Sequence, residues 1–349
     1  MTFMETVFVT GTAGFIGFHL AKDLLQQGYR VVGYDGFTDY YDVTLKRARH
    51  DILTAFPQFQ AHEGMLQDQA MLRDKMRSAN PDVVVHLAAQ AGVRYSLENP
   101  RSYLDSNITG TFNVMENARD LGVKHLLMAS TSSVYGANTQ MPFDESQPTE
   151  TPLSLYAATK KANEAMAHSY AHLWHTPTTM FRFFTVYGPW GRPDLALFKF
   201  AKAAYAGQPI DVYNHGRMSR DFTYVTDLVR SIRHLINTPP ALPADRTHVI
   251  AGDTISSAAP FRVVNIGNGK QVSLMHFIQE LERAIGFTIN KNMLEMQMGD
   301  VQGTWANADL LHALTGYRPS TDVRVGIARF IEWYRAYYGV TMPARVRAA

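Results

Sequence analysis

The stretch VTGTAGFIG, residues 9–17, decides the fold, because it places three glycines between an apolar segment and an amphipathic one. The apolar segment, 6–11, is rich in β-branched residues and predicts a strand, and 15–28 predicts a helix that ends at a glycine. Glycines in such a turn let the backbone approach a pyrophosphate, whose charge is met by the N-terminus of the following helix. The glycines of the turn are Gly11, Gly14 and Gly17. This arrangement predicts a dinucleotide-binding strand–turn–helix unit.

The same alternation of strand and helix continues through the first half of the chain. Nearly continuous apolar runs predict strands at 29–35, 82–89 and 123–130, and a helical pattern runs over 103–122. Strands of a parallel sheet that is covered on both faces are expected to be apolar along their whole length. We therefore expect an α/β fold with a Rossmann-like, doubly wound parallel sheet.

The alternation of predicted strands and helices becomes less regular in the second half of the chain. Residues 237–260 are typical of a surface excursion, and 325–340 predict one more amphipathic helix. We expect a dinucleotide-binding domain over 1–185, with a returning segment around 221–236. A smaller, interleaved mixed α/β domain for the substrate is expected over 186–349.

The composition of the 349-residue chain is that of a soluble globular enzyme, with 46% hydrophobic and 18% charged residues. A formal net charge of +2 indicates neither a nucleic acid nor a membrane surface as partner. The chain has no cysteine, which excludes disulfides and argues against a structural zinc site. It has no apolar run near the ~20 residues of a transmembrane helix, and its acidic N-terminal segment is no signal peptide. We expect a cytoplasmic protein without a metal site.

An acidic residue stands where a dinucleotide fold binds the adenosine ribose. Asp35 follows Gly17 by 18 residues, at the end of the second predicted strand. Its carboxylate can accept hydrogen bonds from the ribose hydroxyls, and it repels a 2′-phosphate. The sequence therefore favours NAD over NADP as the cofactor.

A tyrosine and a lysine lie one helical turn apart in SLYAATKKANEAMAHSYAHLW. Tyr156 precedes Lys160 by four residues, so both side chains share one face of the predicted helix. A tyrosine with its ordinary pKa of about 10 is a weak base at neutral pH. The lysine ammonium, together with the positive nicotinamide of NAD, favours the phenolate. The pair is therefore a candidate for proton transfer with a substrate hydroxyl.

Taken together, these motifs resemble the extended short-chain dehydrogenase/reductase family. The resembling segments span nearly the whole chain and are TGTAGFIG, HLAAQAG, STSSVYG, YAATK, RFFTVYGPWGRP, RDFTYVTDLV and MGDVQGTWAN. Within the family the chain is most similar to the nucleotide-sugar epimerases, and among them to the UDP-glucuronate 4-epimerases. The resemblance implies a tightly bound NAD that is regenerated in each turnover, and a UDP-sugar substrate. It also implies a homodimer formed by helices near 103–122 and 156–172.

The resemblance further implies which residues form the catalytic and cofactor sites. The catalytic residues would be Tyr156, Lys160 and Thr131, whose hydroxyl would bind the sugar C4 hydroxyl and align it with Tyr156. Met65 stands where relatives often have an aspartate that binds adenine. The expected NAD-binding residues are Gly11, Ala13, Gly14, Phe15, Ile16, Gly17, Asp35, Leu66, Leu87, Ala88, Ala89, Gln90, Asn107, Tyr156, Lys160, Phe183 and Val186.

The residues at the hydroxyl run in STSSVYG differ between members of the family that catalyse different reactions. The sugar 4,6-dehydratases carry an Asp-Glu pair just before VYG, and the UDP-glucuronate decarboxylases tend to carry a Glu there. Here Ser132 and Ser133 occupy those positions, and both would support the sugar as it turns. Without an acid for elimination, the remaining chemistry is reversible oxidation at C4, with hydride returned from NAD to the other face of a 4-keto sugar. The resemblance therefore implies interconversion of UDP-glucuronate and UDP-galacturonate.

Downstream segments match the branch of the family that acts on a uronate. Galactose-type 4-epimerases usually have YFN where this chain has FFT, which ends at Thr185. Thr185 and Arg192 match the glucuronate branch, in which they receive the C6 carboxylate. Gln297 stands where many relatives have an arginine, and Asp300 resembles the acid that holds the uridine ribose. The expected substrate-binding residues are Arg94, Ser132, Ser133, Thr185, Arg192, Arg217, Arg220, Gln297 and Asp300.

Three alternatives remain open at this point. The chain could be a 4-epimerase of UDP-glucose or UDP-N-acetylglucosamine, or it could be a UDP-glucuronate decarboxylase. From a different class, it could be a sensor of NAD or of sugar nucleotides without catalytic activity. Intact Thr131, Tyr156 and Lys160 argue against a sensor, since a sensor has no need of all three.

Overall fold

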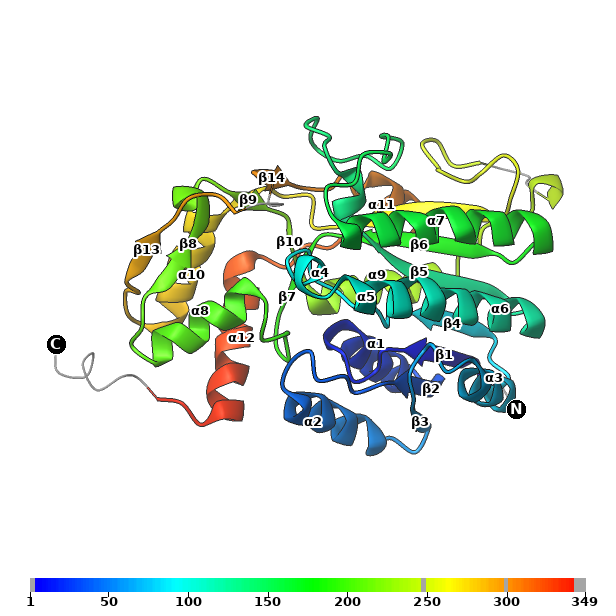
Figure 1. Ribbon diagram of the computed structural model, residues 1–349, viewed down its shortest axis with the longest axis horizontal. Coiled ribbons are helices and arrows are strands. Elements are labelled where there is room, and N and C mark those ends of the chain that lie inside the picture. The colour runs from blue at the N-terminus through cyan, green and yellow to red at the C-terminus, as the bar shows by residue number, and fades with distance from the viewer. Residues whose placement is uncertain (1–3, 246–248, 298–300, 342–349) are drawn as a thin grey trace.

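A parallel seven-stranded sheet forms the centre of the molecule (Figure 1). The structure is a computed structural model that describes residues 4–245, 249–297 and 301–341. The strands of this sheet are β1 (Thr6–Thr10), β2 (Arg30–Asp35), β3 (Phe59–Glu63), β4 (Val83–His86), β5 (His125–Thr131), β6 (Thr178–Phe183) and β11 (Phe261–Ile266). Their order across the sheet is β11-β6-β5-β4-β1-β2-β3, and every neighbouring pair runs parallel. The order reverses at β1, which confirms the predicted doubly wound α/β sheet.

Helices cover both faces of this sheet. They are α1 (Phe15–Gln26), α2 (Val43–Thr54), α3 (Gln69–Ala79), α6 (Thr111–Leu121), α7 (Leu155–Trp174), α9 (Val225–Ile236) and α11 (Asp309–Thr315). Successive side chains of β1 point to opposite faces. Val7 and Val9 are fully buried in a core with α1, α9 and α11, whereas Phe8 is fully buried in a core with α3, α6 and α7. The apolar strands expected from the sequence are apolar because both faces are covered.

A smaller mixed unit lies beside the sheet, at the left of Figure 1. Its helices are α8 (Ala196–Tyr205), α10 (Leu274–Ile285) and α12 (Val323–Tyr338). Three small sheets accompany them, formed by β7 (Thr185–Tyr187) with β10 (Phe222–Tyr224), by β8 (Ile210–Val212) with β13 (Lys291–Met293), and by β9 (Ser219–Arg220) with β12 (Val272–Ser273) and β14 (Gly303–Thr304). The core of this unit is aromatic, and the rings of Phe222 and Phe277 stack with centroids 4.0 Å apart. This unit is the kind of smaller mixed α/β region that the sequence predicts.

Two segments from the second half of the chain return to the large sheet. α9 packs on α1, and an ion pair of 2.7 Å joins Arg233 to Asp23. β11 pairs with β6 at the edge of the sheet, beyond the segment 221–236 that the sequence predicts to return. The division into 1–185 and 186–349 stays a prediction.

The long helix predicted over 103–122 is built in three pieces. It begins as α5 (Pro100–Tyr103), continues as a π-helix over Leu104–Gly110 and ends as α6. A π-helix widens the turn and is frequent at functional sites. Here it carries Asn107, a residue that the sequence assigns to the cofactor site.

The remaining elements are short. They are α4 (Tyr95–Glu98) and the 3-10 helices Ser132–Tyr135, Tyr213–Gly216 and Pro243–Asp245. The described part of 237–260 contains no other helix or strand, as expected for a surface excursion. Among the described residues, no helix is long and apolar enough to cross a membrane.

Candidate active site

The glycine turn between β1 and α1 is too tight for a side chain at Gly11 or Gly17. A Cβ on Gly17 would lie 2.0 Å from the carbonyl oxygen of Gly11, and one on Gly11 would lie 2.9 Å from the backbone nitrogen of Ala88. Gly11 also has a φ of +82°, which favours glycine. Gly14 caps α1 without a side-chain hydrogen bond from any described residue. The first amides of α1 can therefore face a phosphate group.

Asp35 fastens the glycine turn at the end of β2. Its Oδ2 accepts a hydrogen bond of 2.9 Å from the backbone N–H of Ala13, and its Oδ1 accepts one of 2.9 Å from Phe37. Each carboxylate oxygen can accept a further bond. The geometry therefore leaves Asp35 able to bind ribose hydroxyls, as the sequence predicts.

The segment HLAAQ after β4 lies against the same turn. Thr10 Oγ1 accepts hydrogen bonds of 3.1 Å from the backbone N–H groups of Leu87 and Ala88. Asn107 is fully buried; its Oδ1 accepts from the Gln90 N–H at 2.8 Å, and its Nδ2 donates to the Gln90 carbonyl at 3.0 Å. These bonds brace the loop, so a direct contact of Asn107 with NAD stays a prediction.

Four of the apolar residues assigned to the cofactor are buried in the two cores of the large sheet. Phe15, Phe183 and Val186 belong to the core with α1 and α9, and Leu66 belongs to the opposite core. Ile16 packs against the first core and is partly buried. Phe15 can therefore contribute only backbone atoms to a ligand at this turn.

The three residues expected to be catalytic come from β5 and α7. α7 is capped at its N-terminus by Ser154, whose hydroxyl accepts a hydrogen bond of 3.1 Å from the backbone N–H of Ala157. One turn into the helix, the buried Lys160 donates from Nζ to the carbonyl oxygen of Ala129 at 3.0 Å. Thr131, at the end of β5, lies close enough to the hydroxyl of Tyr156 to act on its pKa. The structure thus brings Thr131, Tyr156 and Lys160 together at the C-terminal end of β5.

Burial shifts the pKa values of both titratable members of this group. It raises the pKa of the Tyr156 phenol, while the hydrogen bond with Thr131 and the charge of Arg192 act in the opposite direction. Burial lowers the pKa of the Lys160 ammonium to about 8. The sequence predicts that Lys160 favours the phenolate. Among the described residues, Arg192 is the cation whose charge lowers the pKa of Tyr156, and the effect of Lys160 on the phenolate stays a prediction.

The four hydroxyl side chains of STSS differ in their burial and in their hydrogen-bond partners. Ser130 is buried and donates a hydrogen bond of 2.6 Å to Glu164 on α7, and Arg182 on β6 binds the same carboxylate at 2.8 Å. Thr131 Oγ1 also accepts from the backbone N–H of Ser133 at 3.2 Å, which turns the chain after β5. Ser132 and Ser133 are partly exposed in that turn. Sequence reasoning missed the role of Ser130, because the spacing alone does not show which hydroxyl faces α7.

Arg192 lies in the loop between β7 and α8, close enough to Tyr156 for its charge to act on it. Its guanidinium pairs with Asp194, with Nε at 3.0 Å from Oδ1 and Nη2 at 2.5 Å from Oδ2. Burial raises the pKa of Asp194, but the charge and hydrogen bonds of Arg192 outweigh that effect and hold it below its ordinary value. Thr185, the other residue expected at the sugar carboxylate, begins β7 and is partly exposed.

A buried arginine that the sequence did not reveal ties the two sides of the site together. Arg49 on α2 is fully buried and donates to the carbonyl oxygens of Ala13 at 2.9 Å and Trp190 at 2.6 Å. It also donates to the hydroxyl of Tyr41 at 2.8 Å. An arginine in a charged helix such as α2 is normally expected in solvent, so no pattern in the sequence indicates this role.

The residues expected at the nucleotide are spread over the smaller unit and one loop of the large one. The guanidinium of Arg94 lies 5.0 Å from the ring centre of Tyr213, and Nη1 of Arg220 donates to the carbonyl oxygen of Ser219 at 2.8 Å. Gln297 has a buried Oε1 that accepts from no described residue. Asp300 lies outside the described residues.

A surface hollow of about 720 Å³ adjoins this region. Arg217 lines it, together with Leu153 from the segment before α7 and Trp305 from the segment after β14. Arg217 is exposed. Of the residues expected at the substrate, Arg217 is the one among the described residues that lines this hollow.

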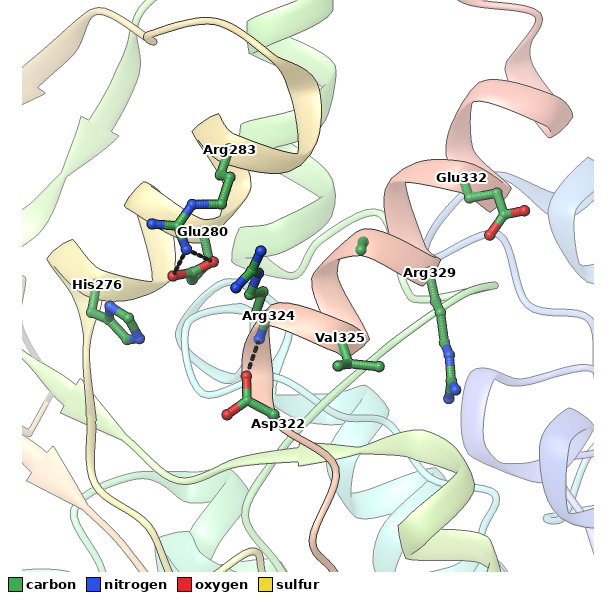
Figure 2. Close-up of a pocket in the computed structure, with 9 residues that line it drawn as sticks. His276, Glu280, Arg283, Asp322, Arg324, Val325, Arg329 and Glu332 are labelled. Carbon is green, nitrogen blue, oxygen red and sulfur yellow. Dashed lines mark hydrogen bonds and ion pairs between the residues drawn. The ribbon is translucent and has the colours of Figure 1, made fainter.

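A second hollow of about 710 Å³ lies between α10 and α12 (Figure 2). Its walls carry charges of both signs, and Arg283 pairs with Glu280 at 2.6 Å. The described residues that line it include none of the expected site residues. The described residues also contain no cluster of three His, Asp or Glu side chains that could hold a metal ion.

Comparison with known proteins identifies the family. Residues 7–251 match the model of the NAD dependent epimerase/dehydratase family. The chain belongs to this family. It is 57% identical over 330 residues to a probable UDP-glucuronate 4-epimerase of Rhizobium meliloti (strain 1021), covering 95% of this chain and 97% of that protein. The resemblance inferred from the motifs is therefore confirmed at the level of the family.

Two further relatives extend the comparison. UDP-glucuronate 4-epimerase 4 of Arabidopsis thaliana is 42% identical over 347 residues, which cover 98% of this chain and 78% of that one. The crystal structure of UDP-glucuronic acid 4-epimerase from Bacillus cereus, in complex with UDP-glucuronic acid and NAD, matches this fold with a TM-score of 0.83. Its sequence is 31% identical, and the match covers 95% of this chain and all of the other.

Proposed function

We propose that this protein is a UDP-glucuronate 4-epimerase, which interconverts UDP-glucuronate and UDP-galacturonate through a transient 4-keto sugar with bound NAD as cofactor. The observation that carries the proposal is the position of Arg192, whose charge acts on Tyr156. A cation that suits a carboxylate thus lies within electrostatic range of the tyrosine expected to transfer a proton. Relatives named as UDP-glucuronate 4-epimerases, at 57% and 42% identity, support the same reading.

The residues at the β1–α1 turn fit NAD. The turn admits no side chain at Gly11 or Gly17, and the uncapped start of α1 offers N–H groups to a diphosphate. Asp35 can accept from the ribose and would repel a 2′-phosphate, which favours NAD over NADP. When bound, NAD supplies a reversible acceptor for the hydride of the sugar C4 atom.

Three residues of this chain would handle the C4 hydroxyl. Thr131 would bind and align it, and Tyr156, which lies near Thr131, would take its proton and later return it. Lys160 has a pKa of about 8, so it is mostly charged at neutral pH and can stabilise negative charge nearby. Ser132 and Ser133 offer no acid for elimination of water, which disfavours dehydration.

Arg192 and Thr185 would hold the C6 carboxylate of the uronate. The 4-keto form of a uronate is a β-keto acid, which loses CO₂ most easily when the carboxylate stands perpendicular to the ketone. Paired donors on a guanidinium can keep the carboxylate in another orientation. We propose that this restraint returns an epimer rather than a pentose.

The test is direct. Purified protein is incubated with UDP-glucuronate, and separately with UDP-glucose, without added NAD, and the sugar protons are followed by NMR. We expect a galacto-configured uronate from UDP-glucuronate. A pentose as the main product would instead indicate a decarboxylase, and conversion of UDP-glucose alone would overturn the assigned substrate. No conversion of either sugar would support the sensor.

We also propose a homodimer formed through the helices near 103–122 and 156–172. Exposed apolar side chains along these helices support it, since Leu104 is 43%, Phe112 41% and Trp174 45% exposed. Light scattering on the purified protein tests the proposal, and a monomeric mass would contradict it.

Three further assignments are proposals: the division into units, the location and the pathway. The chain would divide into a cofactor unit of 1–185 with the returning segment 221–236 and a substrate unit of 186–349. We propose that the enzyme acts in the cytoplasm and supplies uronate units for polysaccharide biosynthesis. A chain without cysteine, which suits a reducing compartment, supports that location.

A further inference from the structure

Asp194 occupies one defined side of the Arg192 guanidinium. It accepts from Nε at 3.0 Å and from Nη2 at 2.5 Å, which is the side-on arrangement of an arginine–carboxylate pair. A guanidinium has a second pair of parallel donors at its end, formed by Nη1 and Nη2. Nη1 donates to no described residue, so the end of Arg192 is available to a second carboxylate.

Asp194 is itself held from the opposite side of the site. The hydroxyl of Tyr40, in the loop after β2, donates to Oδ2 of Asp194 at 3.2 Å. The ring of Tyr40 packs on Tyr95 with centroids 4.7 Å apart, and a Cβ on Gly92 would lie 2.9 Å from its hydroxyl. Tyr40, in the loop after β2, therefore contacts both Asp194, in the loop after β7, and the segment that follows β4.

The backbone before Arg192 is fixed independently of Asp194. Arg49 donates to the carbonyl oxygens of Trp190 at 2.6 Å and Gly191 at 3.3 Å. What remains to be set is the direction of the long Arg192 side chain, which has many rotamers. In the structure, Asp194 sets that direction.

We propose that Asp194 is a positioning residue for substrate recognition, which holds the Nε side of Arg192 so that its Nη1–Nη2 end receives the C6 carboxylate of the substrate. This inference rests on the proposed function. With the Nε side occupied, the substrate carboxylate has a single bidentate orientation on Arg192. Asp194 would therefore act on both the affinity for the uronate and the fraction of keto sugar that loses CO₂.

Asp194 also carries a negative charge, which repels a substrate carboxylate. Its side chain and that of Arg192 are 25% and 20% exposed, so solvent weakens this repulsion. Without Asp194, the Arg192 side chain would lose more conformational freedom when the substrate binds, and this loss would weaken binding. If Asp194 mainly positions Arg192, its removal raises the KM for UDP-glucuronate. If Asp194 mainly repels the substrate carboxylate, its removal lowers that KM.

The experiment compares the wild-type holoenzyme with Asp194→Asn, which keeps one acceptor oxygen, and Asp194→Ala, which keeps none. Asp309→Asn is the matched control, since Asp309 pairs with Arg318 at 2.7 Å on the surface of α11. KM and kcat are measured for UDP-glucuronate, the pentose fraction is measured by NMR, and the Kd of UDP by calorimetry. We expect Asp194→Ala to raise KM on the order of tenfold. Asp194→Asn should raise it less.

A positioning role also predicts the results of the other measurements. kcat and the Kd of UDP should stay within about twofold of the wild type. The pentose fraction should rise in the order wild type, Asn, Ala, and Asp309→Asn should match the wild type throughout.

An unchanged or lowered KM in both Asp194 variants would overturn the inference, and so would an equal loss of UDP affinity, which indicates general damage. A wild-type enzyme that does not convert UDP-glucuronate would overturn the proposed function instead, so the two failures are distinguishable.

Discussion

The two sides of Tyr156 are built in different ways. On one side, Thr131 and Lys160 belong to β5 and α7, and Lys160 is anchored on the backbone of β5. On the other side, Arg192 and Asp194 lie in a loop whose shape depends on Arg49 and Tyr40 from elsewhere in the chain. A rigid framework holds the groups proposed to move protons, and an assembly of loops holds the groups proposed to select the substrate. The same framework can therefore serve different sugars when the loops change.

The largest effect is expected on the framework side, at the phenol. Tyr156→Phe removes the hydroxyl that would take and return the C4 proton, so kcat should fall on the order of 10³-fold. NMR with UDP-glucuronate measures the rate, and calorimetry with UDP tests whether substrate binding survives. A variant with more than a tenth of wild-type turnover would contradict the role of Tyr156.

The stability of the framework should also depend on the buried ion pair between Glu164 and Arg182. Glu164 and Arg182 have side chains that are each 4% exposed, so Glu164→Ala leaves a buried guanidinium unpaired. The free energy of unfolding should fall by about 3 kcal/mol. Denaturant unfolding measures it, and Asp309→Ala, which breaks an exposed pair, should cost less than about 1 kcal/mol. Equal losses in the two variants would show that burial of the first pair is unimportant.

The loop side should affect selectivity rather than stability. Arg192→Ala removes the cation expected at the C6 carboxylate, so binding of UDP-glucuronate should weaken by about 2 kcal/mol, or roughly thirtyfold. The product should contain more pentose. Steady-state kinetics and NMR on one sample test both effects. Unchanged turnover of the uronate without pentose would remove Arg192 from substrate recognition.

The smallest effect is a pH dependence on the framework side. Burial lowers the pKa of Lys160 to about 8 from its ordinary value of 10.5, so above pH 8 the folded protein loses a proton that the unfolded chain retains. The unfolded state then binds more protons, and stability rises with pH, by about 1 kcal/mol between pH 8 and pH 9. The control is Lys160→Met, and the difference between the two unfolding curves isolates this contribution. A difference that does not change with pH would contradict the lowered pKa.

Much of the fold could be predicted from local spacing. Strand Thr6–Thr10 and helix Phe15–Gln26 lie where the apolar runs and glycines place them, because strand and helix periods are short-range properties. The return of β11 to the large sheet was not predicted, because an apolar run of six residues does not show which strand it will pair with.

The candidate site divides in the same way. The sequence by itself determined the glycine turn, Asp35 and the four-residue spacing of Tyr156 and Lys160, since each depends on neighbours within one strand–helix unit. Only the tertiary structure decided that Arg49 reaches Trp190, 141 residues away. It also decided that Asp194 meets Tyr40, which is 154 residues distant. The physical reason is that a hydrogen bond between distant segments depends on how all the intervening elements pack, and no local pattern encodes that outcome.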